Sequence, residues 1–169
     1  MERVKVKLLN ENAVMPTYGS EGAAGFDLYA AEDVIIEPGQ TKKVPLGLAF
    51  ELPPGYVLYI MPRSGISYET KLRQPNSVGV IDSDYRGEVA MMFDNISQDT
   101  WSNAAKGVDG MPDHSTTDKY ESGSYIIRKG DRVCQGVIQK LPKIELVQVD
   151  RLSETKRGAG GFGSTGVHG

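Results

Sequence analysis

The sequence predicts an all-β fold, either a barrel or a sandwich of short strands. Short stretches of alternating or continuous apolar residues recur along the chain, and turn residues separate them at spacings typical of all-β proteins. The 169 residues include 20 glycines and 9 prolines, a content that favours tight turns over a helical bundle. The length suits one domain with its own hydrophobic core.

The expected strands follow one another along nearly the whole chain. Charged and apolar residues alternate over 3–8, as in a half-buried strand, whereas 56–61 is apolar throughout, as in a strand buried on both faces. We also expect a short helix from Ser64 to Lys71, with Ser64 as its N-cap. The other expected strands lie at 26–30, 34–36, 44–51, 78–81, 88–93, 125–127, 130–138 and 144–149.

Composition narrows the classes of partner and location. A net charge of −3 gives no electrostatic argument for nucleic-acid binding, and no apolar run reaches transmembrane length. The single cysteine, Cys134, allows neither an intramolecular disulfide nor a thiolate metal site. The first residues do not resemble a signal peptide. We therefore expect a cytoplasmic location, without nucleic acid or membrane as a partner.

Three stretches hold side chains suited to chemistry on an anion. Asp82 and Asp84 follow a short apolar run and are two residues apart, so on an extended strand they share a face. The turn at 62–65 and the glycine-rich tail at 157–166 offer backbone N–H groups that suit a phosphate. Each stretch taken alone also fits an ordinary solvated turn, a helix cap without a ligand, or a disordered terminus.

Five stretches taken together resemble the five motifs of the homotrimeric dUTPases. In chain order they are AGFDLYA at 24–30, PRSG at 62–65, GVIDSDYRG at 79–87, GDRVCQ at 130–135 and RGAGGFGSTG at 157–166. The resemblance implies a jelly-roll-like β-barrel over 1–152 and a flexible nucleotide-closing tail over 153–169. It also implies a homotrimer with active sites at the subunit interfaces, and Mg²⁺-dependent hydrolysis of dUTP to dUMP and pyrophosphate.

The resemblance implies a role for each matched residue. Asp82 corresponds to the carboxylate that activates water for attack on the α-phosphate, and Tyr85 to the ring that packs on the deoxyribose. Asp27 corresponds to an acidic position that reaches Mg²⁺ through water, so we expect no direct protein ligand to the metal. The remaining substrate-binding positions are Asn76 and Gly79 for the base, Arg63, Ser64, Gly65 and Gln135 for the phosphates, and Arg157, Phe162, Gly163, Ser164 and Thr165 in the tail.

One segment departs from the usual family pattern. Residues 96–124 form a long polar connection that contains Trp101, where typical members have a short turn. The insert resembles that of certain phage dUTPases, which also bind a repressor protein from mobile genetic islands. The alternative is a tolerated surface insertion, because lengthening a loop costs little free energy.

Two other functions compete with dUTP hydrolysis. One is dCTP deaminase, an enzyme on a related trimeric fold; the hairpin at 81–85 and the full tail argue against it. The other is a non-enzymatic module that senses nucleotide or binds the repressor. The intact set of candidate catalytic residues argues against that as the only function.

Overall fold

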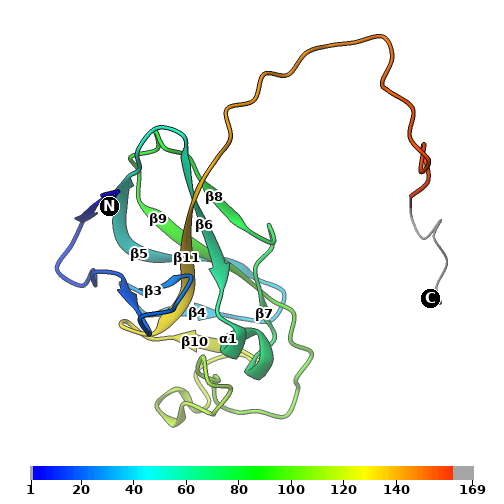
Figure 1. The fold of residues 1–169 in the computed structure, drawn as a ribbon. Coiled ribbons are helices and arrows are strands. Elements are labelled where there is room, and N and C mark those ends of the chain that lie inside the picture. Colours follow the sequence, from blue (N-terminus) through cyan, green and yellow to red (C-terminus); the bar gives the residue numbers. More distant parts are fainter. Residues whose placement is uncertain (1, 162–169) are drawn as a thin grey trace.

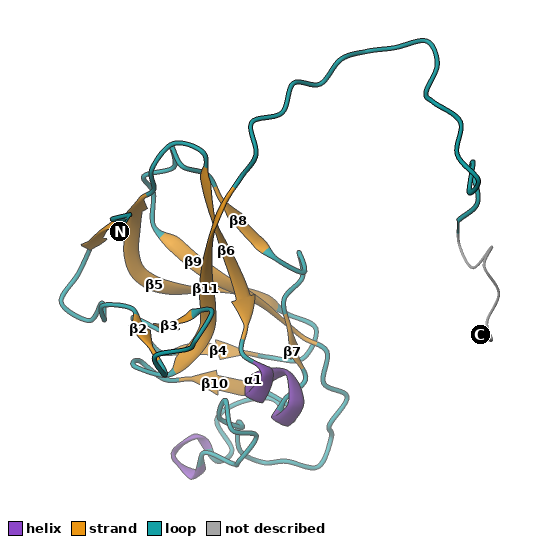
Figure 2. Ribbon diagram, in the orientation of Figure 1, coloured by secondary structure: helices purple, strands orange, loops and turns teal. Residues whose placement is uncertain are grey.

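The strands of the protein surround one hydrophobic core (Figure 1). The computed structural model describes residues 2–161, and strands dominate it (Figure 2). The all-β prediction is confirmed. The elements are β1 (Lys5–Leu8), β2 (Thr17–Tyr18), β3 (Phe26–Tyr29), β4 (Val34–Ile36), β5 (Thr41–Glu51), β6 (Tyr56–Pro62), α1 (Ser64–Glu69), β7 (Leu72–Arg73), β8 (Gly79–Ile81), β9 (Val89–Asn95), the 3₁₀ helix η1 (His114–Thr116), β10 (Tyr125–Ile127) and β11 (Arg132–Lys140).

The two larger sheets share the core. One has the strand order β1-β5-β9-β7 and the other β2-β3-β11-β6-β8, while β10 and β4 form a separate pair. Leu48 and Phe93 from the first sheet and Leu58 and Ile60 from the second belong to one buried cluster. Strand β6 is internal, because it pairs with β11 on one side and with β8 on the other. The prediction that it is buried on both faces holds only in part, because Val57, Leu58 and Ile60 are buried whereas Tyr56, Tyr59 and Met61 are half-buried.

Strand β5 is longer than predicted and contains an irregularity. It begins at Thr41 rather than Val44, and its register with β9 shifts between Pro45 and Leu48. A bulge tolerates Pro45, which has no N–H to donate to a regular ladder. Gly47 has a φ of 65°, and a Cβ there would lie 2.8 Å from the Ala13 Cβ, so this bend requires glycine.

Helix α1 follows β6 directly, but its cap differs from the prediction. Ser64 is the first helical residue, and the N-cap is Arg63, whose side chain makes no capping hydrogen bond. The extended backbone of Arg63, with ψ of 142°, starts the helix one residue earlier than a Ser64 cap would. Within residues 2–161, no helix is long and apolar enough to cross a membrane.

The insert at 96–124 is folded onto the end of the molecule where α1 lies (Figure 1). Ala105 and Thr116 are buried, and the Ala105 N–H donates to the Thr116 Oγ1 at 2.9 Å. The buried amide of Asn95 donates to the carbonyl oxygens of Ile36 and Gly123, which ties the start and the end of the insert to β4. The long polar segment is therefore an ordered structure with its own hydrogen bonds.

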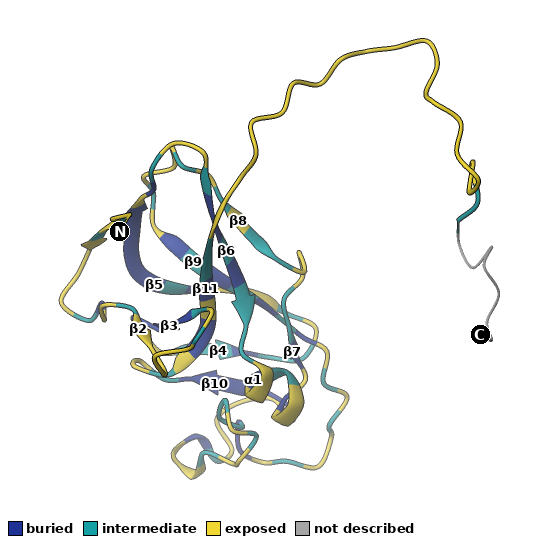
Figure 3. Cartoon of the chain, in the orientation of Figure 1, coloured by how far each residue is buried: buried dark blue, intermediate teal, exposed yellow. Residues whose placement is uncertain are grey.

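The predicted strand at 144–149 is wrong for the single chain. Residues 141–161 contain no strand, and the chain runs away from the sheets after β11 (Figure 3). Leu146 is 95% exposed and Val147 70%. The apolar pattern that suggested a strand has no neighbour within this chain to pair with. The boundary proposed between 152 and 153 stays a prediction.

Candidate active site

The connection between β8 and β9 presents Asp82 and Tyr85. The Tyr85 N–H donates to the Asp82 carbonyl at 3.2 Å, which closes the turn, and the Tyr85 hydroxyl donates to the Glu88 carbonyl at 3.1 Å. A Cβ on Gly87 would lie 2.5 Å from the Tyr85 Cζ, so only glycine lets the ring lie there. The backbone thus fixes the ring while the Asp82 carboxylate stays exposed.

Asp82 and Tyr85 line the same surface cavity of ≈ 470 Å³. Val80, Ile81 and Met92 give it apolar walls, and Lys43 adds a positive charge. A cavity with apolar walls and few polar groups suits a nucleoside, since the walls cover the base or sugar and the polar groups orient it. The structure thus brings Asp82 and Tyr85, which belong to the same motif, to one cavity.

A second cluster forms around Asp27 at the other end of β6. The Asp27 side chain is 8% exposed and contacts two guanidinium groups. The Arg63 Nε lies 3.4 Å from its Oδ1, and an Arg132 nitrogen lies 3.3 Å from its Oδ2. Arg63 also donates to the Arg132 carbonyl oxygen at 3.2 Å. One carboxylate between two arginines leaves a net positive charge, which favours an anionic ligand.

Arg132 belongs to this cluster although no role was predicted for it from the sequence. It lies inside the motif at 130–135, and the register between β11 and β3 shifts between Arg132 and Cys134. Such bulges redirect side chains and are frequent beside functional sites. Gln135, three residues on, lies directly opposite Asp27 in the β11–β3 register. Its place beside the phosphates stays a prediction.

The Asp27 carboxylate has one oxygen without a hydrogen-bond partner among the described residues. Its Oδ1 is buried and accepts no hydrogen bond from the described residues, because the Arg63 contact has ion-pair distance without hydrogen-bond geometry. The free lone pairs can accept a hydrogen bond from a metal-bound water. Across residues 2–161, no three carboxylate, imidazole or thiol side chains gather in the arrangement of a direct site.

Within one chain the two clusters are far apart. Ile81 pairs with Leu58 on β6, so Asp82 lies beyond Leu58, on the side away from Arg63. The six residue-to-residue steps from Val57 to Arg63 span roughly 20 Å of extended chain at about 3.3 Å per residue. A general base must lie within hydrogen-bond reach of its water. Asp82 and the Arg63 of the same chain therefore do not serve one reacting phosphate.

Some of the other predicted residues lie beside these clusters and others lie apart from them. Asn76 is exposed in the turn before β8, and Gly79 packs against Ile60, where a Cβ would lie 3.2 Å from the Ile60 Cβ. Ser64 and Gly65 are exposed at the start of α1, next to Arg63. Arg157 donates to the Gly160 carbonyl at 2.8 Å and is exposed in the tail. Phe162, Gly163, Ser164 and Thr165 lie outside the described residues.

Comparison with known proteins agrees with the motifs. The sequence model of the dUTPase family matches residues 11–104 and 120–166, and the unmatched 105–119 fall inside the insert. The deoxyuridine 5'-triphosphate nucleotidohydrolase of Nautilia profundicola is 40% identical over 164 residues, covering 97% of this chain and 99% of that protein.

Solved structures of phage dUTPases superpose closely. Staphylococcus bacteriophage 80alpha dUTPase with dUPNHPP has a TM-score of 0.90 and 34% identity, covering 99% of this chain and 100% of that one. The D95N mutant dUTPase of Staphylococcus aureus phage phi11, described with a structural Mg(II) ion, has a TM-score of 0.81 and 31% identity, covering 89% of this chain and 98% of that one. The chain belongs to the dUTPase family.

Proposed function

We propose that the protein hydrolyses dUTP to dUMP and pyrophosphate, with Asp82 as the general base. The observation that carries the proposal is the shared cavity of Asp82 and Tyr85, placed directly after β8 in a chain of the dUTPase family. Tyr85 packs on the deoxyribose, and Asn76 and the Gly79 backbone read the uracil. The ring of Tyr85 leaves no room for a ribose 2′-hydroxyl.

The reaction needs an aligned water and stabilisation of charge. Asp82 takes a proton from the water while the water oxygen bonds to the α-phosphorus. The bond from the α-phosphorus to the oxygen that bridges it to the β-phosphorus then breaks, which releases pyrophosphate. Arg63, Ser64, Gly65 and Gln135 hold the phosphate oxygens. Such positioning and electrostatic stabilisation supply most of the catalysis in phosphoryl transfer. Arg157, Phe162, Gly163, Ser164 and Thr165 close over the nucleotide.

Mg²⁺ is the proposed cofactor. It prefers phosphate oxygens and water to an all-protein cage, and it neutralises charge on the triphosphate when bound. The buried Asp27 Oδ1 has the free acceptor capacity to orient one of the metal's waters. The phi11 relative is described with a structural Mg(II) ion, which supports magnesium use without locating a catalytic ion in this chain.

We infer that each active site combines residues from different copies of a homotrimer. The separation of Asp82 from Arg63 along β6 supports this arrangement, because a second chain can then complete the site. A shared site also agrees with the division of residue types, because the Asp82 cavity holds the candidate base and the Arg63 cluster holds the cationic groups. The protein would act in the cytoplasm, or in the host cytoplasm if a phage encodes it.

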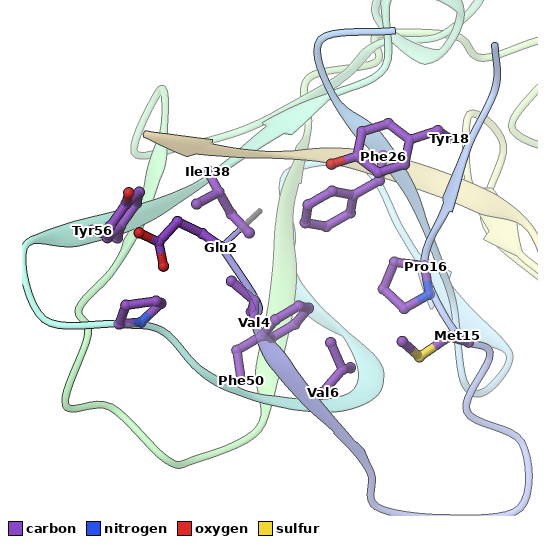
Figure 4. Close-up of a pocket in the computed structure, with 11 residues that line it drawn as sticks. Glu2, Val4, Val6, Met15, Pro16, Tyr18, Phe26, Phe50, Tyr56 and Ile138 are labelled. Atoms are coloured by element: carbon purple, nitrogen blue, oxygen red, sulfur yellow. The ribbon is translucent and has the colours of Figure 1, made fainter. Parts of the chain in front are cut away.

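The exposed segment 144–149 supports the same assembly. An apolar groove of ≈ 310 Å³ lies between β1 and β2, which are outer strands of the two larger sheets (Figure 4). Val4, Val6, Phe26 and Phe50 are among its lining residues. Unpaired strand edges readily accept a further strand. We propose that residues 144–149 of a neighbouring copy pair there and cover the groove.

Pyrophosphate release from dUTP, dTTP, dCTP and UTP, each with and without Mg²⁺, tests the activity. We expect rapid release from dUTP alone, and only with the metal. Ammonia release from dCTP would instead indicate the deaminase. Absence of any pyrophosphate from dUTP would leave a nucleotide-sensing module as the better description.

A second proposed role is binding of a repressor protein through the insert. Trp101 is 94% exposed, although its backbone N–H donates a hydrogen bond to the Asp99 carboxylate at 2.9 Å. Exposed tryptophans on ordered backbone are frequent anchors of protein interfaces. Titration of the protein against purified repressors of mobile genetic islands tests this role, with Trp101→Ala as the matched variant. Equal binding by both proteins, or by neither, would remove the insert from the role.

A further inference from the structure

Three contacts from the insert and its flanks converge on residues 69–71, at the C-terminal end of α1. The Ile96 N–H donates to the Lys71 carbonyl at 3.1 Å. The Lys71 N–H donates to the Tyr125 hydroxyl at 3.0 Å. Between these two ends, the turn at 107–111 brings Gly110 against the Glu69 carbonyl oxygen. The segment after α1 is therefore held from the start, the middle and the end of the insert.

The contact at Gly110 is too close for any other residue. A Cβ there would lie 2.5 Å from the Glu69 carbonyl oxygen and 3.4 Å from the Glu69 Cβ. The turn that carries Gly110 is fixed by its own hydrogen bonds, from Gly107 to the Met111 carbonyl at 2.8 Å and from Gly110 to the Gly107 carbonyl at 3.0 Å. Backbone thus meets backbone, and neither side can move aside as a flexible side chain would.

Helix α1 connects residues 69–71 to Ser64 and Gly65. It is a single short element, from Ser64 to Glu69, with Ile66 buried in the core. Thr70 binds the helix end to the next strand, because its Oγ1 donates to the Ile66 carbonyl at 2.6 Å and accepts from the Leu72 N–H at 3.0 Å. We therefore expect a shift at residues 69–71 to displace Ser64 and Gly65 as well.

We propose that the insert is a brace for the phosphate-binding turn, with Gly110 and Tyr125 as positioning residues. The insert holds the C-terminal end of α1 and thereby fixes Ser64 and Gly65 where they meet the phosphates. The proposal rests on the proposed function, since it assigns the insert to the phosphate half of the same site. It makes the insert part of substrate binding rather than an inert surface loop.

The test compares Gly110→Ala with a glycine that has the same backbone strain and no neighbour. Gly39 has φ of 76° against 75° for Gly110, and nothing lies within 4 Å of its Cβ position. Calorimetry on the full-length oligomer measures the affinity of each variant for dUMP and for the non-hydrolysable imido analogue of dUTP. Tyr125→Phe, which removes only the hydroxyl that binds Lys71, carries the test if Gly110→Ala does not fold.

Gly110→Ala and Tyr125→Phe should weaken binding of the analogue by at least about 5-fold, which is the order of one lost hydrogen bond. Binding of dUMP should change less, and Gly39→Ala should bind both ligands as the parent protein does. Equal effects of Gly110→Ala and Gly39→Ala, or equal losses for dUMP and analogue, would overturn the brace. A parent protein that releases no pyrophosphate from dUTP would instead overturn the proposed function, and the brace with it.

Discussion

At the scale of single residues, Asp82 and Asp84 are similar carboxylates with different surroundings. Asp82 and Asp84 are both exposed in the same connection after β8, but only Asp82 lines the cavity with Tyr85. Asp84 instead faces the region lined by Arg3, Lys5 and Arg86. The two positions therefore offer a matched pair in which charge and exposure are alike and only the placement differs.

Asp82→Asn should lower kcat at least ~100-fold, because an amide cannot accept the water's proton. Binding of the imido analogue of dUTP should stay within a few-fold of the parent protein. Asp84→Asn, the control, should keep near-normal turnover. Steady-state kinetics and calorimetry measure these quantities, and near-normal turnover of Asp82→Asn would refute its assignment as the base.

Asp27 shows both the reach and the limit of the sequence at this scale. The motif at 24–30 placed it among the functional residues, but its two arginine partners come from segments far along the chain. No local pattern indicates that Arg63 and Arg132 meet at one carboxylate, because the pairing of β11 with both β3 and β6 brings them there.

At the scale of elements, the insert is attached to the rest of the molecule by an ion-pair network. Arg128, beside β10, contacts Asp113 of the insert at 2.6 Å and Asp33 at 2.7 Å. Hydrogen bonds from the Ser115 hydroxyl and, with a smaller effect, from Arg128 lower the pKa of Asp113 to about 2. Hydrogen bonds from the Lys129 N–H and, with a smaller effect, from Arg128 lower the pKa of Asp33 as well.

These lowered values predict that acid loosens the insert. A carboxylate with a lowered folded-state pKa stabilises the fold above its unfolded pKa and loses that contribution as pH falls through the folded value. For Asp113, from 3.8 to about 2, the loss falls between about pH 4 and pH 2. Trp101 is the only tryptophan of the chain, so its fluorescence anisotropy reports the insert.

Anisotropy should stay constant down to about pH 4 and then fall, before the far-ultraviolet circular dichroism of the strands changes. Asp113→Asn should start lower and respond less to acid. Asp118→Asn, in the same insert but without a side-chain hydrogen bond, should behave as the parent protein does. A parent transition that coincides with global unfolding would contradict a separate loosening of the insert.

At the scale of the whole molecule, one strand that the sequence predicts does not form in the single chain. The strand expected at 144–149 is absent from the described chain, and its proposed partner is a neighbouring copy. The strands at 56–61 and 88–93 were predictable, since their partners lie within the same sheets. Sequence patterns report that a segment favours a strand, but not whose sheet it joins.

Leu146→Asp tests the partner of this segment. The side chain is 95% exposed, so the substitution should leave the fold of an isolated chain unaffected. If residues 144–149 cover the groove of a neighbouring copy, a buried charge there should weaken the oligomer. Analytical ultracentrifugation should show dissociation at concentrations where Met111→Asp, a 64% exposed control in the insert, stays assembled. Equal masses for the two variants would argue against the proposed docking.

We propose that each site joins Asp82 of one copy to the Arg63 cluster of another. This arrangement is tested by co-expressing Asp82→Asn and Arg63→Ala chains with different tags and purifying the mixed oligomers. Each variant alone should be nearly inactive. Mixed trimers should have about one third of their sites active, because only one of their three interfaces combines an intact Asp82 with an intact Arg63. Mixed oligomers no more active than either variant alone would show that one chain builds the whole site.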